Sequence, residues 1–180
     1  VTFWVFLETQ SVFATGMIAG IYLVFTASFG IWFGSIVDHN AKKLAMLGSS
    51  VVSAICYAIG VALVLLEPDG AFQNPYGPYL WAFILVIMFG VIAGNIRSIA
   101  LPTLGTILIP EDRRDKANGL VGMVTGIGFL TTSVISGFLV ANAGMLGVLS
   151  LSLAATVLAF LHLVLVRIDE GRAPVDPAKP

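Results

Sequence analysis

Charged residues are absent from long stretches of the chain. No Asp, Glu, Lys or Arg occurs in residues 9–37 or 44–66, and Arg97 is the one such residue in 79–109. A fourth stretch without these residues covers 117–166. An α-helix needs roughly 20 apolar residues to cross the hydrocarbon core of a bilayer, which is about 30 Å thick. Each stretch reaches that length, and the fourth is long enough for two crossings.

The same stretches decide the fold class. Only helices and closed barrels satisfy their backbone hydrogen bonds inside a membrane, and barrel strands alternate apolar and polar residues over segments of about 10 residues. These stretches are continuously apolar instead. The chain is 58% hydrophobic and 11% charged, whereas a soluble domain is roughly 25% charged. The sequence therefore predicts an all-α, polytopic helical bundle in a membrane and excludes a large soluble fold.

The predicted membrane domain covers residues 1–168. Its first apolar run, residues 1–7, is too short to span a bilayer, and we interpret it as the outer end of a first helix whose beginning is missing. A cleaved signal peptide is less favoured, because no basic region or small-residue cleavage site precedes the run. Five complete spans are predicted at residues 13–37, 44–66, 79–109, 117–140 and 145–167, with a tight turn at 141–144. Residues 169–180 contain three prolines and are predicted to form a cytoplasmic linker.

The basic residues predict the orientation of these spans. Eight of the nine Lys and Arg lie in alternate connections or at their edges, and Arg97 is the exception. The eight are Lys42, Lys43, Arg113, Arg114, Lys116, Arg167, Arg172 and Lys179. The positive-inside rule places those connections and the carboxy-terminal tail in the cytoplasm. The connections at 8–12, 67–78 and 141–144 contain no Lys or Arg, so they are expected to face outward. Tyr76, Tyr79 and Trp81 would anchor the following span at the outer interface.

The hinge between the second and third spans carries a family resemblance. Gly34, Asp38, Lys42 and Lys43 resemble the signature Gly-x-x-x-Asp-(Arg/Lys)-x-Gly-(Arg/Lys)-(Arg/Lys) of the major facilitator superfamily. Two positions depart from it, with His39 in place of the basic residue and Ala41 in place of the second glycine. In such a motif a glycine permits close helix approach, the aspartate accepts hydrogen bonds or faces a helix dipole, and the lysines meet the anionic inner leaflet.

A second charged segment joins the fourth and fifth spans and carries Glu111, Asp112, Arg113 and Arg114. It resembles the matching cytoplasmic turn of bacterial drug and macrolide efflux carriers. Our hypothesis is a cytoplasmic charge cluster, in which these four residues and the hinge residues Asp38, Lys42 and Lys43 lock one conformation of the carrier. The alternative is a solvated loop, because exposed ion pairs are each worth only about 0 to 1 kcal/mol.

The resemblance implies the amino-terminal, six-helix half of a twelve-helix carrier, with a substrate site near the bilayer midplane between the halves. The implied function is secondary active transport by alternating access, with proton-coupled efflux of drug-like or amphipathic compounds as the leading interpretation. The alternatives are an uptake symporter of the same fold and a non-transporting scaffold or half-carrier. The implied partners are a small-molecule substrate, protons, the lipid bilayer and the missing carboxy-terminal half, in a bacterial inner membrane. We expect no enzyme activity, cofactor, metal site or nucleic-acid binding.

Arg97 is the leading candidate for the transport pathway, together with Asn95 beside it. An ionisable group inside a span is costly and indicates function by default. Arg97 follows Trp81 by sixteen residues, so a helix would place it about 24 Å from the outer interface. One alternative is that the side chain snorkels to the inner headgroups. The other follows from the resemblance, since many facilitator antiporters have an arginine in the fourth span that faces the central cavity.

Two further patterns concern coupling and helix contacts. None of the ten Asp and Glu lies inside spans two to six, so a proton-titrating carboxylate would come from the missing part of span one or from the second half, or coupling takes another route. The Gly-Pro pair typical of antiporters is Thr132-Ser133 here, which weakens the antiport interpretation. Small-residue pairs that allow close helix contact in lipid occur at Gly16/Gly20, Gly30/Gly34, Gly90/Gly94 and Gly122/Gly126.

Overall fold

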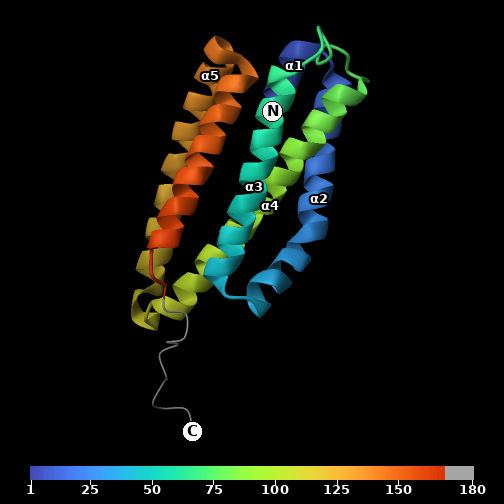
Figure 1. Cartoon of the computed structure of the whole chain (residues 1–180). Helices are drawn as coiled ribbons and strands as arrows, with labels where there is room; N and C mark the ends of the chain where they lie inside the picture. The colour runs from blue at the N-terminus through green and yellow to red at the C-terminus, as the bar shows by residue number, and fades with distance from the viewer. Residues whose placement is uncertain (169–180) are drawn as a thin grey trace.

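The computed structural model describes residues 1–168, and within them it contains helices and no strand (Figure 1). The helices are α1 Thr2–Thr9, α2 Val12–His39, α3 Lys42–Leu65, α4 Pro78–Leu108, a 3₁₀ turn η1 at Glu111–Arg113, and α5 Arg114–Leu165. The predicted all-α class is confirmed for these residues. The predicted linker, 169–180, lies outside the described residues.

Four helices are long and apolar enough to cross a membrane: Val12–His39, Lys42–Leu65, Pro78–Gly105 and Glu111–Leu165. The last of them reverses direction at Gly144, where φ is 61° and ψ is −161°. This left-handed backbone favours glycine, because a Cβ would crowd the residue's own backbone. Figure 1 shows the result as two antiparallel arms, residues 114–143 and 145–165. The reversal falls within the predicted 141–144 turn, but helical geometry continues up to Gly144. The count of five complete spans stays a prediction.

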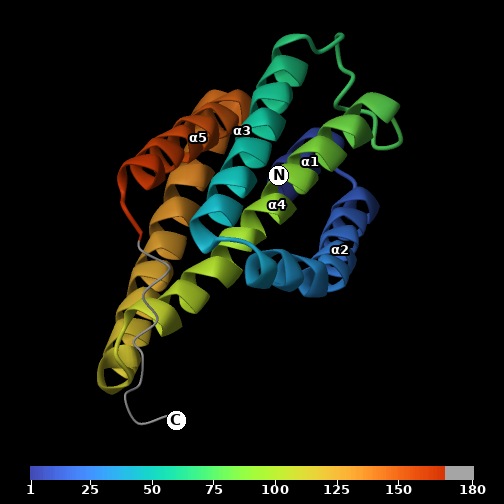
Figure 2. The same cartoon turned by 60° about the horizontal axis from the view of Figure 1, so that its bottom comes forward.

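Successive helices run in opposite directions, so the connections gather at two ends of the bundle (Figure 1). We call the end with the 66–77 loop and Gly144 the outer end, and the end with the 40–41 hinge and η1 the inner end. Figure 2 shows α2 and α5 on opposite sides of the α3 and α4 pair. The order agrees with the contacts, which are most extensive between α3 and α4 and between α3 and α5.

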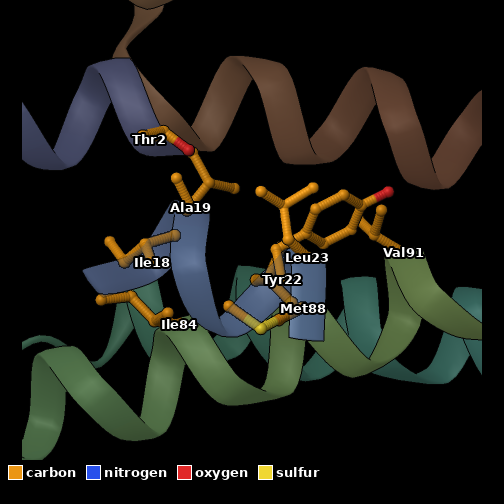
Figure 3. Close-up of a pocket in the computed structure, with 10 residues that line it drawn as sticks. Thr2, Ile18, Ala19, Tyr22, Leu23, Ile84, Met88 and Val91 are labelled. Carbon is orange, nitrogen blue, oxygen red and sulfur yellow. The ribbon is translucent and has the colours of Figure 1, made fainter. Parts of the chain in front are cut away.

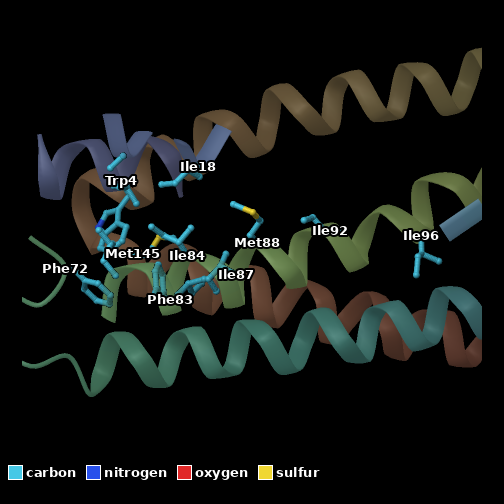
Figure 4. Packing of buried hydrophobic residues seen from close by; sticks show 14 of the residues in the cluster. Trp4, Ile18, Phe72, Phe83, Ile84, Ile87, Met88, Ile92, Ile96 and Met145 are labelled. Carbon is cyan, nitrogen blue, oxygen red and sulfur yellow. The ribbon is translucent and has the colours of Figure 1, made fainter. Parts of the chain in front are cut away.

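Helix α4 is the central helix of the bundle. Half of its most apolar stretch is buried, against 11% of the corresponding stretches in α2 and α5. Figure 4 shows its inward-facing side chains in a row, with Phe83, Ile84, Ile87, Met88, Ile92 and Ile96 packed among the neighbouring helices. The spacing of three to four residues is the period of a helix that buries one side. Helix α2 and the first arm of α5 instead expose large apolar side chains, as lipid-facing helices do.

Candidate functional site

Helices α3 and α4 approach each other closely at Gly90. A Cβ built on Gly90 would lie 2.7 Å from the Cβ of Cys56 on α3, a distance that real side chains do not adopt. The fully buried Ser53 hydroxyl donates a 2.7 Å hydrogen bond to the carbonyl oxygen of Gly90. Gly94 lies one turn further along α4 on the same side and also faces Ser53. The Gly90/Gly94 pair is therefore a true helix contact, as its spacing predicted.

The other three glycine pairs do not lie at helix contacts in the described residues. A Cβ built on any of these glycines would have no atom within 4 Å other than those of its chain neighbours and of the nearby backbone of its own helix. The glycines are Gly16, Gly20, Gly30, Gly34, Gly122 and Gly126. Small-residue spacing identifies a helix face without identifying what covers it. For Gly34 of the hinge motif, the close helix approach suggested by the motif has no partner within residues 1–168.

The side chain of Arg97 folds back along α4. Its Nη2 atom lies 3.3 Å from the position that a Cβ would take on Gly94, and the Ser53 Oγ lies 3.6 Å from that position. Gly94 is one helical turn nearer the outer end, so the guanidinium extends away from the inner end. In this geometry the side chain does not snorkel toward the inner interface. Its place in a transport pathway stays a prediction.

Asn95 does not share a face with Arg97. Two residues separate them by about 200° around the helix axis. Asn95 instead shares a face with Val91 and Ser98, at a spacing of three to four residues. Asn95 is half-buried and Ser98 is exposed, with its hydroxyl donating 2.7 Å to the carbonyl of Asn95. The two predicted pathway residues therefore belong to different sides of α4.

Val91, on the same side of α4 as Asn95, lines an apolar pocket between α2 and α4 (Figure 3). The pocket has a volume of about 430 Å³, and Thr2 of α1 lines one side of it. Ile18, Tyr22 and Met88 are among the side chains that line it. It lies directly beside Val1, the first residue of the chain.

At the inner end, the hinge lysines contact the ends of α2 and α5. Asp38 is exposed near the end of α2, and its backbone carbonyl accepts a 3.5 Å hydrogen bond from the Lys42 ammonium group. Lys43 reaches the end of α5, where its Nζ donates to the carbonyls of Val164 at 3.1 Å and Val166 at 2.6 Å. These carbonyls belong to the negative end of the α5 dipole, so a cation is favourable there.

The second charged segment is exposed. Glu111 and Asp112 lie in η1, and Arg113 Nε is 3.7 Å from Asp112 Oδ2, with both side chains more than 70% exposed. An ion pair this exposed contributes little. Arg114 donates through Nε to the carbonyl of Ile109 at 3.1 Å, which closes the turn on α4. The predicted cluster that joins this segment to the hinge stays a prediction.

Sequence reasoning missed the link from Lys43 to α5. The positive-inside rule places a lysine at this membrane face, and helix ends attract cations. Neither rule says which helix end it meets, because the partner carbonyls lie 121 and 123 residues further along the chain.

We expect Lys43→Ala to loosen the end of α5. Removing the ammonium group leaves the terminal carbonyls without this cation, which costs about 0.5 to 1 kcal/mol at a partly exposed helix end. Amide hydrogen exchange of the purified full-length protein should become about two- to fivefold faster in peptides covering 160–166. Lys43→Arg should keep most of the protection, and Lys116→Ala, in the first turn of α5, should not change it. Equal exchange in Lys43→Ala and wild type would contradict the link.

Comparison with known proteins identifies one family. The family model described as Major Facilitator Superfamily matches residues 2–180, so it covers both charged segments and all the helices. No curated protein and no solved structure matches the chain.

Proposed function

Because the chain belongs to the major facilitator superfamily, we propose that it is the amino-terminal half of a carrier that exports small amphipathic compounds in exchange for protons. The family match supports a multi-pass membrane transporter of the facilitator type. The export direction, the proton coupling, the second half, the bacterial inner membrane and the cytoplasmic tail are parts of the proposal.

Arg97 is the observation that carries the proposal. It lies in a helix long and apolar enough to span the membrane, and its guanidinium extends away from the inner end. A scaffold has no use for a charge held at this depth, because the charge opposes insertion. A carrier does, since charged groups inside the membrane bind substrates or couple to ions. Asn95 and Ser98 add polar groups on another side of the same helix.

The pocket beside Val1 supports the proposed half-carrier arrangement. The apolar side chains of α2 and α4 that line it would pack against a further helix of the carrier. The exposed faces of α2 and of the first arm of α5 would meet lipid or the second half. The hinge with Asp38 and Lys43 would then control contacts between helix ends during alternating access.

Export is tested in cells that express the full-length gene at matched membrane levels. Ethidium serves as a cationic dye and carboxyfluorescein as an anionic dye, each loaded and then followed as it leaves. We expect wild type to export at least one dye and a protonophore to stop it. Arg97→Ala and Asp38→Asn should reduce the initial rate by about tenfold or more, as expected when a charged group in the transport cycle is removed. Lys116 is an exposed charge outside the proposed machinery, so Lys116→Ala should retain the export rate of wild type.

Retention of both dyes by wild type would overturn the export proposal. Accumulation above the level of cells without the gene would favour the uptake alternative. Export that Arg97→Ala leaves intact would remove Arg97 from the transport cycle.

A further inference from the structure

The apolar stretches of the chain contain a single charged residue, and it is positive. Arg97 is the single Asp, Glu, Lys or Arg in residues 9–37, 44–66, 79–109 and 117–166 together. The ten carboxylates of the chain lie outside these stretches, at Glu8, Asp38, Glu67, Asp69, Glu111, Asp112, Asp115, Asp169, Glu170 and Asp176. The apolar part of this half therefore carries one positive charge and no negative one.

Within residues 1–168, the structure records no hydrogen bond and no ion pair for the Arg97 side chain, which is half-buried. A guanidinium offers five N–H donors in a fixed fork. The residues of α3 recorded near it, Ser53 beside Gly94 and Tyr57, carry hydroxyl groups and no compensating charge. A charge in a membrane is costly unless an opposite charge or several acceptors meet it.

The Arg97 side chain is half-buried, so part of it can be reached by a ligand. Helix α3 covers α4 at Gly90 and Gly94, but Leu101, one turn after Arg97 toward the inner end, is exposed. Leu101 follows Arg97 by four positions, so the two residues share a side of α4. A ligand resting on this side of α4 would meet the exposed part of the Arg97 side chain.

We propose that Arg97 anchors an anion-binding site and that the exported compound is an organic anion with a carboxylate, sulfonate or phosphonate group. This inference rests on the proposed carrier function. The planar guanidinium fork pairs with two oxygens of such a group, and an ammonium group does this less well. A cationic compound would meet an uncompensated like charge, which costs affinity and favours anions. The apolar side chains around the site would contact the uncharged body of the compound.

The test measures how fast phenylglyoxal modifies Arg97 in the purified full-length protein, by mass spectrometry of the peptide that contains it. Three probes share one ring system and differ in charge: naphthalenesulfonate, naphthalenesulfonamide and naphthylmethylammonium. We expect the sulfonate to slow modification of Arg97 by about tenfold, the effect of a charge-assisted hydrogen bond. The neutral and cationic probes should change it less than about twofold. Exposed Arg113 should react equally in all samples.

Two results of the modification experiment would overturn the anion site. One is equal modification of Arg97 with all three probes. The other is no modification even without a probe, since a carboxylate from another part of the carrier would then occupy the guanidinium. An Arg97→Lys variant gives an independent readout: naphthalenesulfonate should still bind it, with about tenfold weaker affinity measured by equilibrium dialysis. Unchanged affinity would also contradict the site.

The dye experiment separates this inference from the function on which it rests. Export of carboxyfluorescein in preference to ethidium supports both. Export of ethidium alone leaves the carrier function standing and overturns the anion class. Export of neither dye overturns the export function, whatever the modification rates show.

Discussion

Replacing Trp4 by alanine is expected to lower the free energy of unfolding by about 3 to 5 kcal/mol, the usual cost of removing a buried aromatic side chain. Trp4 is 5% exposed and is held edge-on between two rings. Its ring centroid lies 5.2 Å from that of Phe72 and 5.5 Å from that of Phe83, with interplanar angles of 79° and 62°. The cluster connects α1, the 66–77 loop and α4, so the outer end should loosen. Thermal unfolding of the purified full-length protein should show a Tm lower by about 5 °C or more.

Trp32→Ala is the matched control for Trp4→Ala. Trp32 is also a tryptophan on a helix beside other rings, with centroids 6.0 Å from Phe29 and 6.4 Å from Phe33. It is 61% exposed, so its removal leaves no internal cavity and should cost about 1 kcal/mol or less. Similar losses in the two variants would show that lipid contact, rather than the outer-end cluster, sets the stability.

The outer-end aromatics illustrate the limit of sequence interpretation. Tyr76, Tyr79 and Trp81 were predicted as interfacial anchors, and Tyr76 is indeed 75% exposed. The other two have internal partners: Tyr79 donates its hydroxyl proton to the carbonyl of Leu63 at 2.6 Å, and Trp81 donates through Nε1 to that of Pro75 at 2.9 Å. Aromatic residues near a membrane face suit both roles, because one edge is polar and the rest apolar. Sequence spacing alone does not separate them.

The helices themselves were largely predictable because bilayer thickness fixes their length. The predicted 44–66 and 79–109 stretches compare with α3 Lys42–Leu65 and α4 Pro78–Leu108. The reversal at Gly144 was also readable, since a small-residue turn interrupts an apolar run that is too long for one span. These features depend on residues close together in the chain, which is why the sequence alone contains them.

The candidate site was predictable only as a set of residue types. Arg97 stands out as a charge in an apolar stretch, but the direction of its side chain, back toward Gly94, is visible only in the structure. Lys43 was predicted as a motif residue, but the partners that the structure gives it are carbonyls of α5, and every residue has a carbonyl. Contacts between segments far apart in the chain leave no clear pattern in the sequence around either partner, so they are seen only in the folded structure.

The α3 and α4 contact leads to the second prediction. Gly90→Ala is expected to lower the free energy of unfolding by about 2 kcal/mol. The added Cβ would lie 2.7 Å from that of Cys56, and neither atom can move without its backbone. Overpacking of this kind costs about 1 to 3 kcal/mol, and separating the helices also strains the buried hydrogen bond from Ser53 to Gly90. Alanine's better helix propensity, about 1 kcal/mol, offsets part of the loss. The Tm of the purified full-length protein measures the result.

Two variants separate this contact from a general effect of glycine replacement. Gly94→Ala adds the same methyl group one turn away, but its nearest neighbour, at 3.3 Å, is the flexible end of Arg97, so we expect a loss of less than about 1 kcal/mol. In the double variant Gly90→Ala with Cys56→Gly, the Cys56 Cβ that the added methyl group would meet is removed and the clash disappears. The Tm should recover beyond the sum of the two single effects, because residues in contact are not additive. Additive losses would mean that Gly90 and Cys56 do not touch, and that the central helix pair is held elsewhere.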